Sequence, residues 1–249
     1  MLVPILLLLY PDEEPQTITA ISLFVVCANA ISGSIAYARQ GRIDYRSGGW
    51  FAISTLPGAV LGAVVVGYIP RDLFDGIFAV TLTGLGLYLA LRSGRQTIQA
   101  PVTGRGVVGR MFTDRRGQTF VYSFQLWKGM LYSAGIGFMS SLLGIGGGVI
   151  HVPVMTTVLH FPIHIATATS QFVLMFMSAQ GTSVHLATGN LSFDEGLTKA
   201  ILLAAGAIPG AQAGALAARY LHGDVITRAL AGSLVLVGVR LGLKAAGIV

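Results

Sequence analysis

Four glycines within five residues, Gly144-Ile145-Gly146-Gly147-Gly148, have the composition of a backbone anion site. They lie in an otherwise apolar run from 135 to 158, and since each Gly costs a helix about 1 kcal/mol relative to Ala, they predict a helix break. Irregular backbone at membrane depth occurs only where protein or a water-filled cavity surrounds it. The free N–H groups of the helix that follows attract anions. The alternative is that these glycines let two helices pack closely.

Small polar side chains in other apolar segments are candidates for the same site. Hydroxyl and amide donors suit an oxyanion, because they hydrogen-bond it without the cost of burying a fixed charge. A histidine just past the glycines could help to neutralise an anion or carry a proton. Alternatively, the hydroxyls only join helices, at about 0.6 kcal/mol each. The candidate substrate-binding residues are Gly144, Gly146, Gly147, Gly148, Ser22, Asn29, Thr169, Ser170, Gln171 and His151.

The sequence contains no residue pattern typical of a catalytic site or a metal site. No His, Cys, Asp and Glu residues have metal-ligand spacing, and no Ser-His-Asp or paired-carboxylate pattern falls at membrane depth. We therefore expect no cofactor, no metal and no enzymatic activity.

The sequence also bears on how transport is driven. No acid lies in the middle of a predicted span, whereas proton- and sodium-coupled carriers commonly use one there. The membrane potential alone supplies about 2.3 kcal/mol per charge per 100 mV, which favours anion export roughly fifty-fold. A channel-like pore would also fit.

The composition is that of a membrane protein. Of 249 residues, 53% are hydrophobic and 10% are charged, whereas soluble domains carry about 25% charge. The net charge of +6 could suggest nucleic acid, but most arginines lie in loops between apolar segments, which is typical of cytoplasmic loops. We predict an all-α polytopic membrane protein of 7–8 transmembrane helices with one glycine-broken helix and no nucleic-acid partner. The predicted spans are about 17–38, 48–68, 73–91, 130–159, 163–186, 198–218 and 225–243.

The two halves of the chain are repeats. An offset of 148 residues superposes Thr19, Ser22, Gly33 and Gly41 on Thr167, Ser170, Gly181 and Gly189, and an offset of 152 superposes Pro57 and Gly58 on Pro209 and Gly210. We predict a first transmembrane repeat over 1–91, a basic cytoplasmic linker over 92–128 and a second repeat over 129–249, each repeat with four helices. Secondary transporters are commonly built this way, with the substrate at the repeat interface.

Charge predicts the orientation in the membrane. The loops after Ala38 and Leu91 are basic and belong inside, while Asp12-Glu13-Glu14 can face out. If the glycine-broken segment crosses the membrane, Val249 lies inside and the repeats are parallel. If that segment is re-entrant, the second half is inverted. The sequence leaves both arrangements open.

The motifs resemble those of the TauE/SafE family of sulfite and organosulfonate exporters. The resemblance rests on Gly135-Ile-Gly-Phe, Leu143-Gly144-Ile-Gly-Gly-Gly148, Pro153 and Ala166-Thr-Ala-Thr-Ser170. It implies an inner-membrane permease that exports a small anion through the bilayer. The alternatives are an uptake permease or channel for another small anion and, with less support, a membrane enzyme or scaffold. Homo-oligomerisation stays open.

One departure from the family pattern concerns the first repeat. Leu2-Val3-Pro4 aligns with Val152-Pro153, which follows the glycine break in the second half. Members of the family carry a glycine-rich break before the first proline as well. By this resemblance we expect the first repeat of this sequence to lack its first glycine-rich segment, with its N-terminal helix truncated. Either a start codon upstream of Met1 supplies these residues, which is the alternative we favour, or the segment is genuinely short and activity is in doubt.

Overall fold

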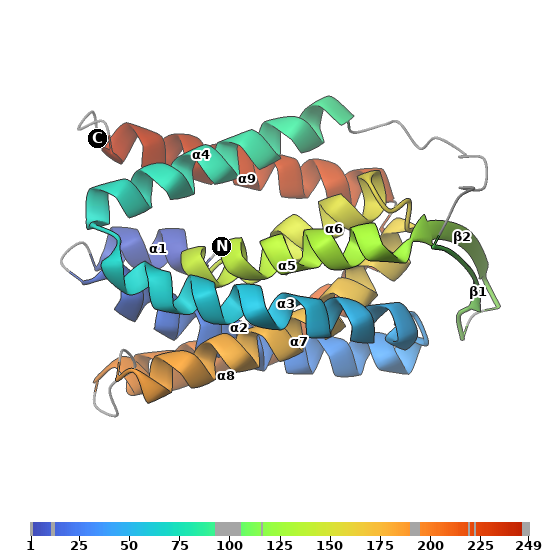
Figure 1. The fold of residues 1–249 in the computed structure, drawn as a ribbon, viewed down its shortest axis with the longest axis horizontal. Coiled ribbons are helices and arrows are strands. Elements are labelled where there is room, and N and C mark those ends of the chain that lie inside the picture. The colour runs from blue at the N-terminus through green and yellow to red at the C-terminus, as the bar shows by residue number, and fades with distance from the viewer. Residues whose placement is uncertain are drawn as a thin grey trace.

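The fold is a bundle of long helices with a small β-hairpin at one end (Figure 1). The computed structural model describes residues 2–10, 13–92, 106–115, 117–189, 195–218, 220–221 and 223–245. The elements in chain order are α1 (Leu2–Leu9), α2 (Pro15–Gln40), α3 (Tyr45–Val65), the 3₁₀ turn η1 (Val66–Tyr68), α4 (Arg71–Arg92), β1 (Val107–Thr113), β2 (Thr119–Gln125), α5 (Leu126–Leu143), α6 (Gly148–Thr157), α7 (Ile163–Ala187), α8 (Glu195–Ala218) and α9 (Gly223–Ala245).

Long apolar runs explain the helices. Four stretches in the described residues are long and apolar enough to cross a membrane: Pro15–Gln40, Tyr45–Tyr68, Arg71–Leu91 and Gly196–Ala218. Such a span needs about 20 residues, because a helix rises 1.5 Å per residue and the hydrocarbon core is about 30 Å thick. The prediction of an all-α polytopic membrane protein is confirmed.

The glycine break reverses the direction of the chain. A Cβ built at Gly129, in the first turn of α5, would lie 3.2 Å from Cδ1 of Leu159, which follows α6. The start of α5 and the end of α6 therefore lie at the same end of the bundle, and the two helices form a re-entrant hairpin (Figure 1). Of the two arrangements left open by the sequence, the structure has the inverted one. The end of α9 consequently lies opposite the β-hairpin (Figure 1).

Helices α2 and α7 pack through a pair of related contacts. A Cβ at Gly33 of α2 would lie 3.0 Å from Cγ of Gln171 in α7, and a Cβ at Gly181 of α7 would lie 2.9 Å from Cδ1 of Leu23 in α2. The offset of 148 residues relates the two contacts, because it superposes Gly33 on Gly181 and Leu23 on Gln171. Reciprocal contacts of this kind are what a two-fold axis produces.

Helices α3 and α5 pack in parallel at very close range. A Cβ at Gly58 or Gly62 would collide with the carbonyl oxygens of Ala134 and Phe138, respectively. Small residues at this spacing let the backbones of membrane helices approach one another. Gly86 of α4 and Gly238 of α9 make a second close contact of this kind, since a Cβ there would lie 2.8 Å from the backbone nitrogen of Val235 and 2.7 Å from that of Thr83, respectively.

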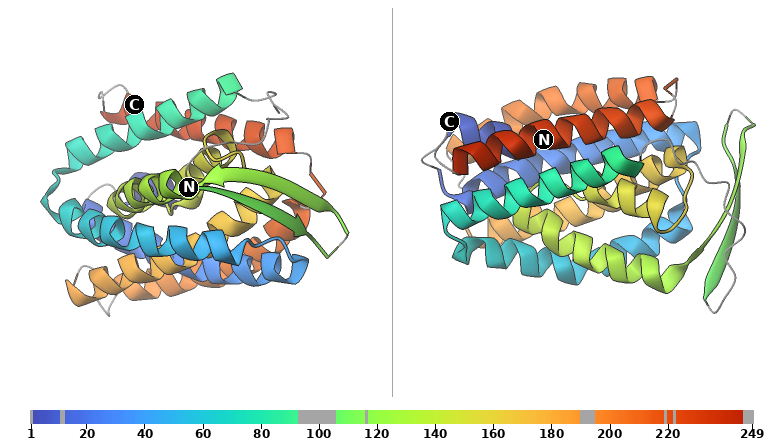
Figure 2. Two further views of the ribbon diagram at one scale, coloured as in Figure 1. Left: turned by 45° about the vertical axis from the view of Figure 1, so that its right-hand side comes forward. Right: turned by 90° about the horizontal axis from the view of Figure 1, so that it is seen from above.

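The β-hairpin is fixed to the bundle by buried ion pairs. Arg42, after α2, bonds Asp114 at the hairpin turn, with 2.9 Å between Nη2 and Oδ2. Asp44 accepts a hydrogen bond of 2.9 Å from the hydroxyl of Tyr122, and Nε of Arg110 lies 3.4 Å from its carboxylate. Burial raises the pKa of Tyr122 above its usual range, and the Asp44 carboxylate raises it further, so the hydroxyl remains a donor. Figure 2 shows the hairpin standing across one end of the helices.

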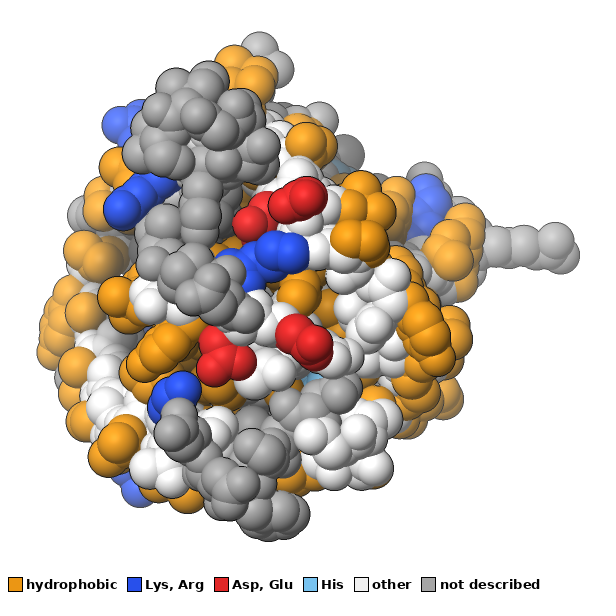
Figure 3. Space-filling view, turned by 90° about the vertical axis from the view of Figure 1, so that its left-hand side faces the viewer, with side chains coloured by type: hydrophobic (Ala, Val, Ile, Leu, Met, Phe, Trp, Pro, Cys, Tyr) orange, Lys and Arg blue, Asp and Glu red, His pale blue; other side chains and the backbone are white. Residues whose placement is uncertain are grey.

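The opposite end of the bundle carries a second group of charges. Arg71 donates to the backbone carbonyls of Glu13 and Leu7, and Lys199 lies 3.6 Å from the carboxylate of Glu13. The contact with Leu7 places a cation at the C-terminus of α1, where the helix dipole favours positive charge. Acidic and basic side chains gather on this face (Figure 3).

Candidate functional site

The glycine-rich turn between α5 and α6 requires glycine at two positions. Gly144 has φ of 62° and Gly146 has φ of 74°, a region that side chains with a Cβ rarely adopt. Gly147 then serves as the N-cap of α6. These glycines make the chain reverse inside the bundle, and they also let the turn pack closely on α2, since a Cβ at Gly144 would lie 3.0 Å from Cα of Thr19.

The first turn of α6 faces an unpaired hydroxyl. The N–H groups of Gly148 and Val149 have no carbonyl within the helix to which they can donate. A Cβ built at Gly148 would lie 3.8 Å from Oγ of Ser170 in α7. Ser170 is 1% exposed, and its Oγ has no hydrogen-bond partner among the described residues. The turn therefore places free backbone donors beside a buried hydroxyl with unused hydrogen-bonding capacity.

Helix α1 approaches the same turn from the other side. A Cβ at Gly144 would lie 3.1 Å from Cγ2 of Val3, near the start of α1. The end of α1 contacts the start of α4, since Arg71 bonds the carbonyl of Leu7, while the end of α6 contacts the far end of α4, where Tyr88 bonds Thr157. The two short helices thus run apart from the turn in opposite directions (Figure 1), each with its N-terminus at the turn. Half-helices arranged this way hold anionic groups in transporters.

Ser22 and Ser170, which the offset of 148 residues superposes, make different contacts. Oγ of Ser22 donates to the carbonyl of Gly144 at 2.6 Å, and the residue is 1% exposed. This bond satisfies a carbonyl left free at the C-terminus of α5. Ser22 therefore stabilises the turn itself, whereas Ser170 has a hydroxyl available for a ligand.

His151 joins the two arms of the α5–α6 hairpin. Its Nε2 lies 3.1 Å from Oγ of Ser133 in α5, and both residues are buried. Its ring also packs against Phe51 of α3, with 5.9 Å between centroids. These contacts give His151 a role in holding α6 in place.

The remaining predicted residues connect neighbouring helices. Oγ1 of Thr169 accepts a hydrogen bond of 3.0 Å from the backbone N–H of Asp44, after α2. Nε2 of Gln171 donates to the carbonyl of Asn29 at 3.3 Å. The structure therefore brings Ser170 to the first turn of α6, whereas Thr169 and Gln171 fix α7 against α2 and the residues that follow it.

Four buried hydroxyls near the turn were missed by the sequence reasoning. They come from the three helices that meet there, and none has a hydrogen-bond partner in the part of the chain that the structure describes: Thr19 of α2, Ser140 and Ser141 of α5, and Thr182 of α7. A Cβ at Gly181 would lie 3.4 Å from Oγ of Ser141. The Ser140-Ser141 pair three residues before the glycines was the available signal, since adjacent polar residues are costly in an apolar span.

The donors at this site are neutral. Backbone N–H groups and hydroxyls can hold an oxyanion without a fixed charge that would slow its release. Within the described residues no group of three His, Cys, Asp or Glu side chains could share a metal ion. The arrangement is suited to reversible binding of a small anion.

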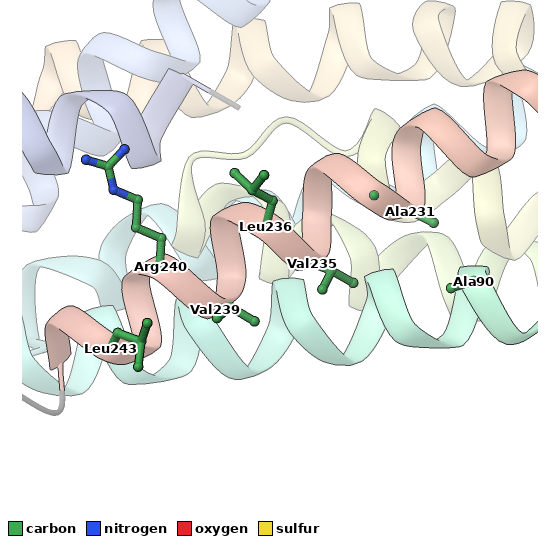
Figure 4. Close-up of a pocket in the computed structure, with 8 residues that line it drawn as sticks. Ala90, Ala231, Val235, Leu236, Val239, Arg240 and Leu243 are labelled. Carbon is green, nitrogen blue, oxygen red and sulfur yellow. The ribbon is translucent and has the colours of Figure 1, made fainter. Parts of the chain in front are cut away.

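An apolar cavity of about 610 Å³ lies elsewhere, along α9 (Figure 4). It is lined by residues of α9, including Val235, Val239 and Arg240, together with Ala90 of α4. None of the predicted site residues lines this cavity. Its apolar lining suits hydrocarbon chains, so we do not assign it to the anion site.

Comparison with known proteins identifies the family. The model of the sulfite exporter TauE/SafE family matches residues 1–241. A probable membrane transporter protein, YunE of Bacillus subtilis (strain 168), is 30% identical over 233 residues, which cover 94% of this chain and 83% of that protein. Probable membrane transporter proteins of Haemophilus influenzae and Sinorhizobium sp are 28% and 26% identical, over 62% and 74% of this chain and 52% and 61% of their own lengths. No solved structure matches. The chain belongs to the sulfite exporter TauE/SafE family and is a membrane transporter.

Proposed function

We propose that this transporter exports a small oxyanion, sulfite or an organosulfonate, across the inner membrane along the membrane potential. The observation that carries the proposal is the buried, unpaired hydroxyl of Ser170 beside the first turn of α6. A helix N-terminus favours an anion by up to about 2 kcal/mol in a partly buried setting. The hydroxyl adds a donor that the described residues do not otherwise use.

The arrangement of the two halves supports alternating access to this site. The reciprocal contacts at Gly33 and Gly181 lie between α2 and α7, and the two half-helices α1 and α6 start beside this interface. A site between inverted repeats can be opened to either side of the membrane by rocking one repeat against the other. The unpaired hydroxyls of Thr19, Ser141 and Thr182 would line the route from the turn toward the end that carries Glu13.

The distribution of charge supports outward transport. Arg42, Arg110 and Arg115 lie at the β-hairpin end, which by the excess of basic residues is the cytoplasmic end. An anion moving from there to the opposite end leaves a negative interior, which supplies about 2.3 kcal/mol per charge per 100 mV. Export then needs no coupling ion.

A panel of sulfur oxyanions tests the substrate class. Cells expressing the protein should survive sulfite, sulfoacetate or another sulfonate at concentrations that inhibit cells without it, and they should retain less of the labelled anion. Retention unchanged for every member of the panel would refute the proposal. Increased retention would instead support an uptake permease.

A further inference from the structure

The apolar cavity along α9 is a groove that is open to the outside of the bundle (Figure 4). We call it the α9 groove. Ala90, Ala231 and Gly232 carry little or no side chain, which leaves the space, and a Cβ at Gly232 would have no atom within 4 Å outside its own helix. Leu236 and Leu243 line the groove and are 69% and 38% exposed. In a protein that spans a membrane, exposed side chains of this kind face hydrocarbon.

The dimensions of the α9 groove match one acyl chain. Its lining on α9 extends from Ala231 to Leu243, which at 1.5 Å per residue is about 18 Å. The hydrocarbon of one leaflet is about 15 Å thick, half of the bilayer core. The volume of about 610 Å³ lies within the range of small-molecule sites, about 300–1,000 Å³. An acyl chain lying along α9 would therefore fill the groove.

Arg240 is the charged residue among the described residues that line the α9 groove. It is exposed, and it takes part in none of the ion pairs found in the described part of the chain. Figure 4 shows its guanidinium pointing away from Val239 and Leu243. Since α9 ends at Ala245, the long side chain can reach the level of the headgroups, as arginines near helix ends do. A guanidinium at the edge of the hydrocarbon without a partner is costly, so a ligand anion would stabilise it.

The residue that the offset of 152 residues superposes on Arg240 has a partner within the protein. That residue is Tyr88, whose hydroxyl donates to Oγ1 of Thr157 at 3.3 Å. The same offset superposes Gly86 on Gly238, and these two glycines make the related contacts between α4 and α9 described above. The polar group at one of the two related positions is thus bonded inside the bundle, whereas the guanidinium at the other is available to a ligand.

We propose that the α9 groove binds an anionic phospholipid, with one acyl chain along α9 and the phosphate at Arg240. The fork of guanidinium donors matches two oxygens of a phosphate. A headgroup without an amine, such as that of phosphatidylglycerol, leaves its phosphate available, whereas an ethanolamine headgroup carries its own cation. Arg240 therefore favours the anionic lipid. Since neither Ser170 nor the α5–α6 turn lines the groove, this lipid site is separate from the candidate anion site.

The first experiment measures lipid binding to the purified protein by native mass spectrometry. Delipidated protein in detergent is titrated with equal amounts of phosphatidylglycerol and phosphatidylethanolamine. The parent should retain one phosphatidylglycerol per chain in preference to phosphatidylethanolamine, and Arg240→Gln should retain it about tenfold less, because it loses a charged hydrogen-bond donor.

Arg228→Gln is the matched control for this substitution. It removes the same charge from an exposed position on α9 that does not line the groove, and it should retain phosphatidylglycerol as the parent does. Equal retention by Arg240→Gln and Arg228→Gln overturns the proposal. Equal retention of the two lipids by the parent, or a dimer of the parent that retains no lipid, also overturns it.

The second experiment fills the α9 groove and reads a thermal melt. Phosphatidylglycerol should raise the melting temperature of the parent by about 5 °C, and Gly232→Leu should lose most of this shift, because the new side chain occupies the place of the acyl chain. Gly84→Leu is the control, since Gly84 is also exposed with no neighbouring atom within 4 Å, but lies outside the groove. Equal shifts in the two variants would show that no chain lies along α9. An equal shift of the parent with inorganic phosphate would show that Arg240 binds free phosphate instead of a lipid. Since neither readout involves transport, this proposal and anion export can fail independently.

Discussion

Replacing Ser170 with Ala separates a binding role from a structural role. The hydroxyl is 1% exposed and has no partner among the described residues, so it costs the fold about 1–3 kcal/mol as an unsatisfied buried group. Its removal should leave the melting temperature unchanged or raise it. A structural hydroxyl would show the opposite response.

The same substitution should weaken binding of the anion. A hydroxyl that donates to an anion contributes about 1.5–3 kcal/mol, so Ser170→Ala should raise the dissociation constant about 10- to 150-fold. The assay is equilibrium binding of the transported oxyanion to the purified protein, paired with a thermal melt of the same sample. Lower affinity together with equal or greater stability is the signature of a preformed site.

Ser178→Ala is the matched control for this prediction. Ser178 is buried on the same helix, but its Oγ donates to the carbonyl of Leu174 at 2.6 Å within α7. This variant should bind the anion as the parent does. If Ser170→Ala binds as tightly as the parent, or loses no more affinity than Ser178→Ala, the anion does not contact Ser170 and the reasoning is refuted.

Three further outcomes are expected. Ser22→Ala should lower the free energy of unfolding by about 1–3 kcal/mol, measured by chemical denaturation in detergent, because it leaves a buried carbonyl unpaired; unchanged stability would contradict the assigned contact. Asp114→Leu should cost about 3–5 kcal/mol and expose the β-hairpin to protease, whereas Arg42→Met combined with Asp114→Leu should restore most of the loss; equal damage in both would rule out the ion pair as the cause. In a Cys-free background, Gln118→Cys should be protected from impermeant thiol reagents in intact cells and Tyr68→Cys should be labelled; the reverse pattern would invert the orientation.

The sequence was sufficient for the helices and for the location of the break. Hydropathy located the long spans because length and apolar content alone decide whether a helix can cross a bilayer. It could not tell whether the glycine segment crosses the membrane or returns, since both need the same apolar residues. The contact between Gly129, at the start of α5, and Leu159, after α6, decides that question, and it depends on how the two helices pack in the folded bundle.

Side-chain partners were the part that the sequence could not supply. Ser22 and Ser170 are indistinguishable as repeat positions, but only Ser22 meets the carbonyl of Gly144. The β-hairpin was predicted only as a basic linker, because its fold depends on the pair that Arg42 makes with Asp114, 72 residues away. Residues 93–105 of that linker lie outside the described residues.

The central claim is that the anion binds at the first turn of α6, beside Ser170. Its most direct test is potential-driven anion flux in proteoliposomes. Gly148→Ala fits without a clash, since its Cβ would lie 3.5 Å from Cδ2 of Leu174, but it places a methyl group 3.8 Å from Oγ of Ser170, where the anion would sit. Gly135→Ala, on the exposed side of α5, is the matched control. With a clamped potential of 100 mV, the parent and Gly135→Ala should concentrate a monovalent sulfur oxyanion toward the positive side up to about fifty-fold, and Gly148→Ala should not. Flux through Gly148→Ala equal to that of the parent, or no potential-dependent flux of any anion through the parent, would contradict the account.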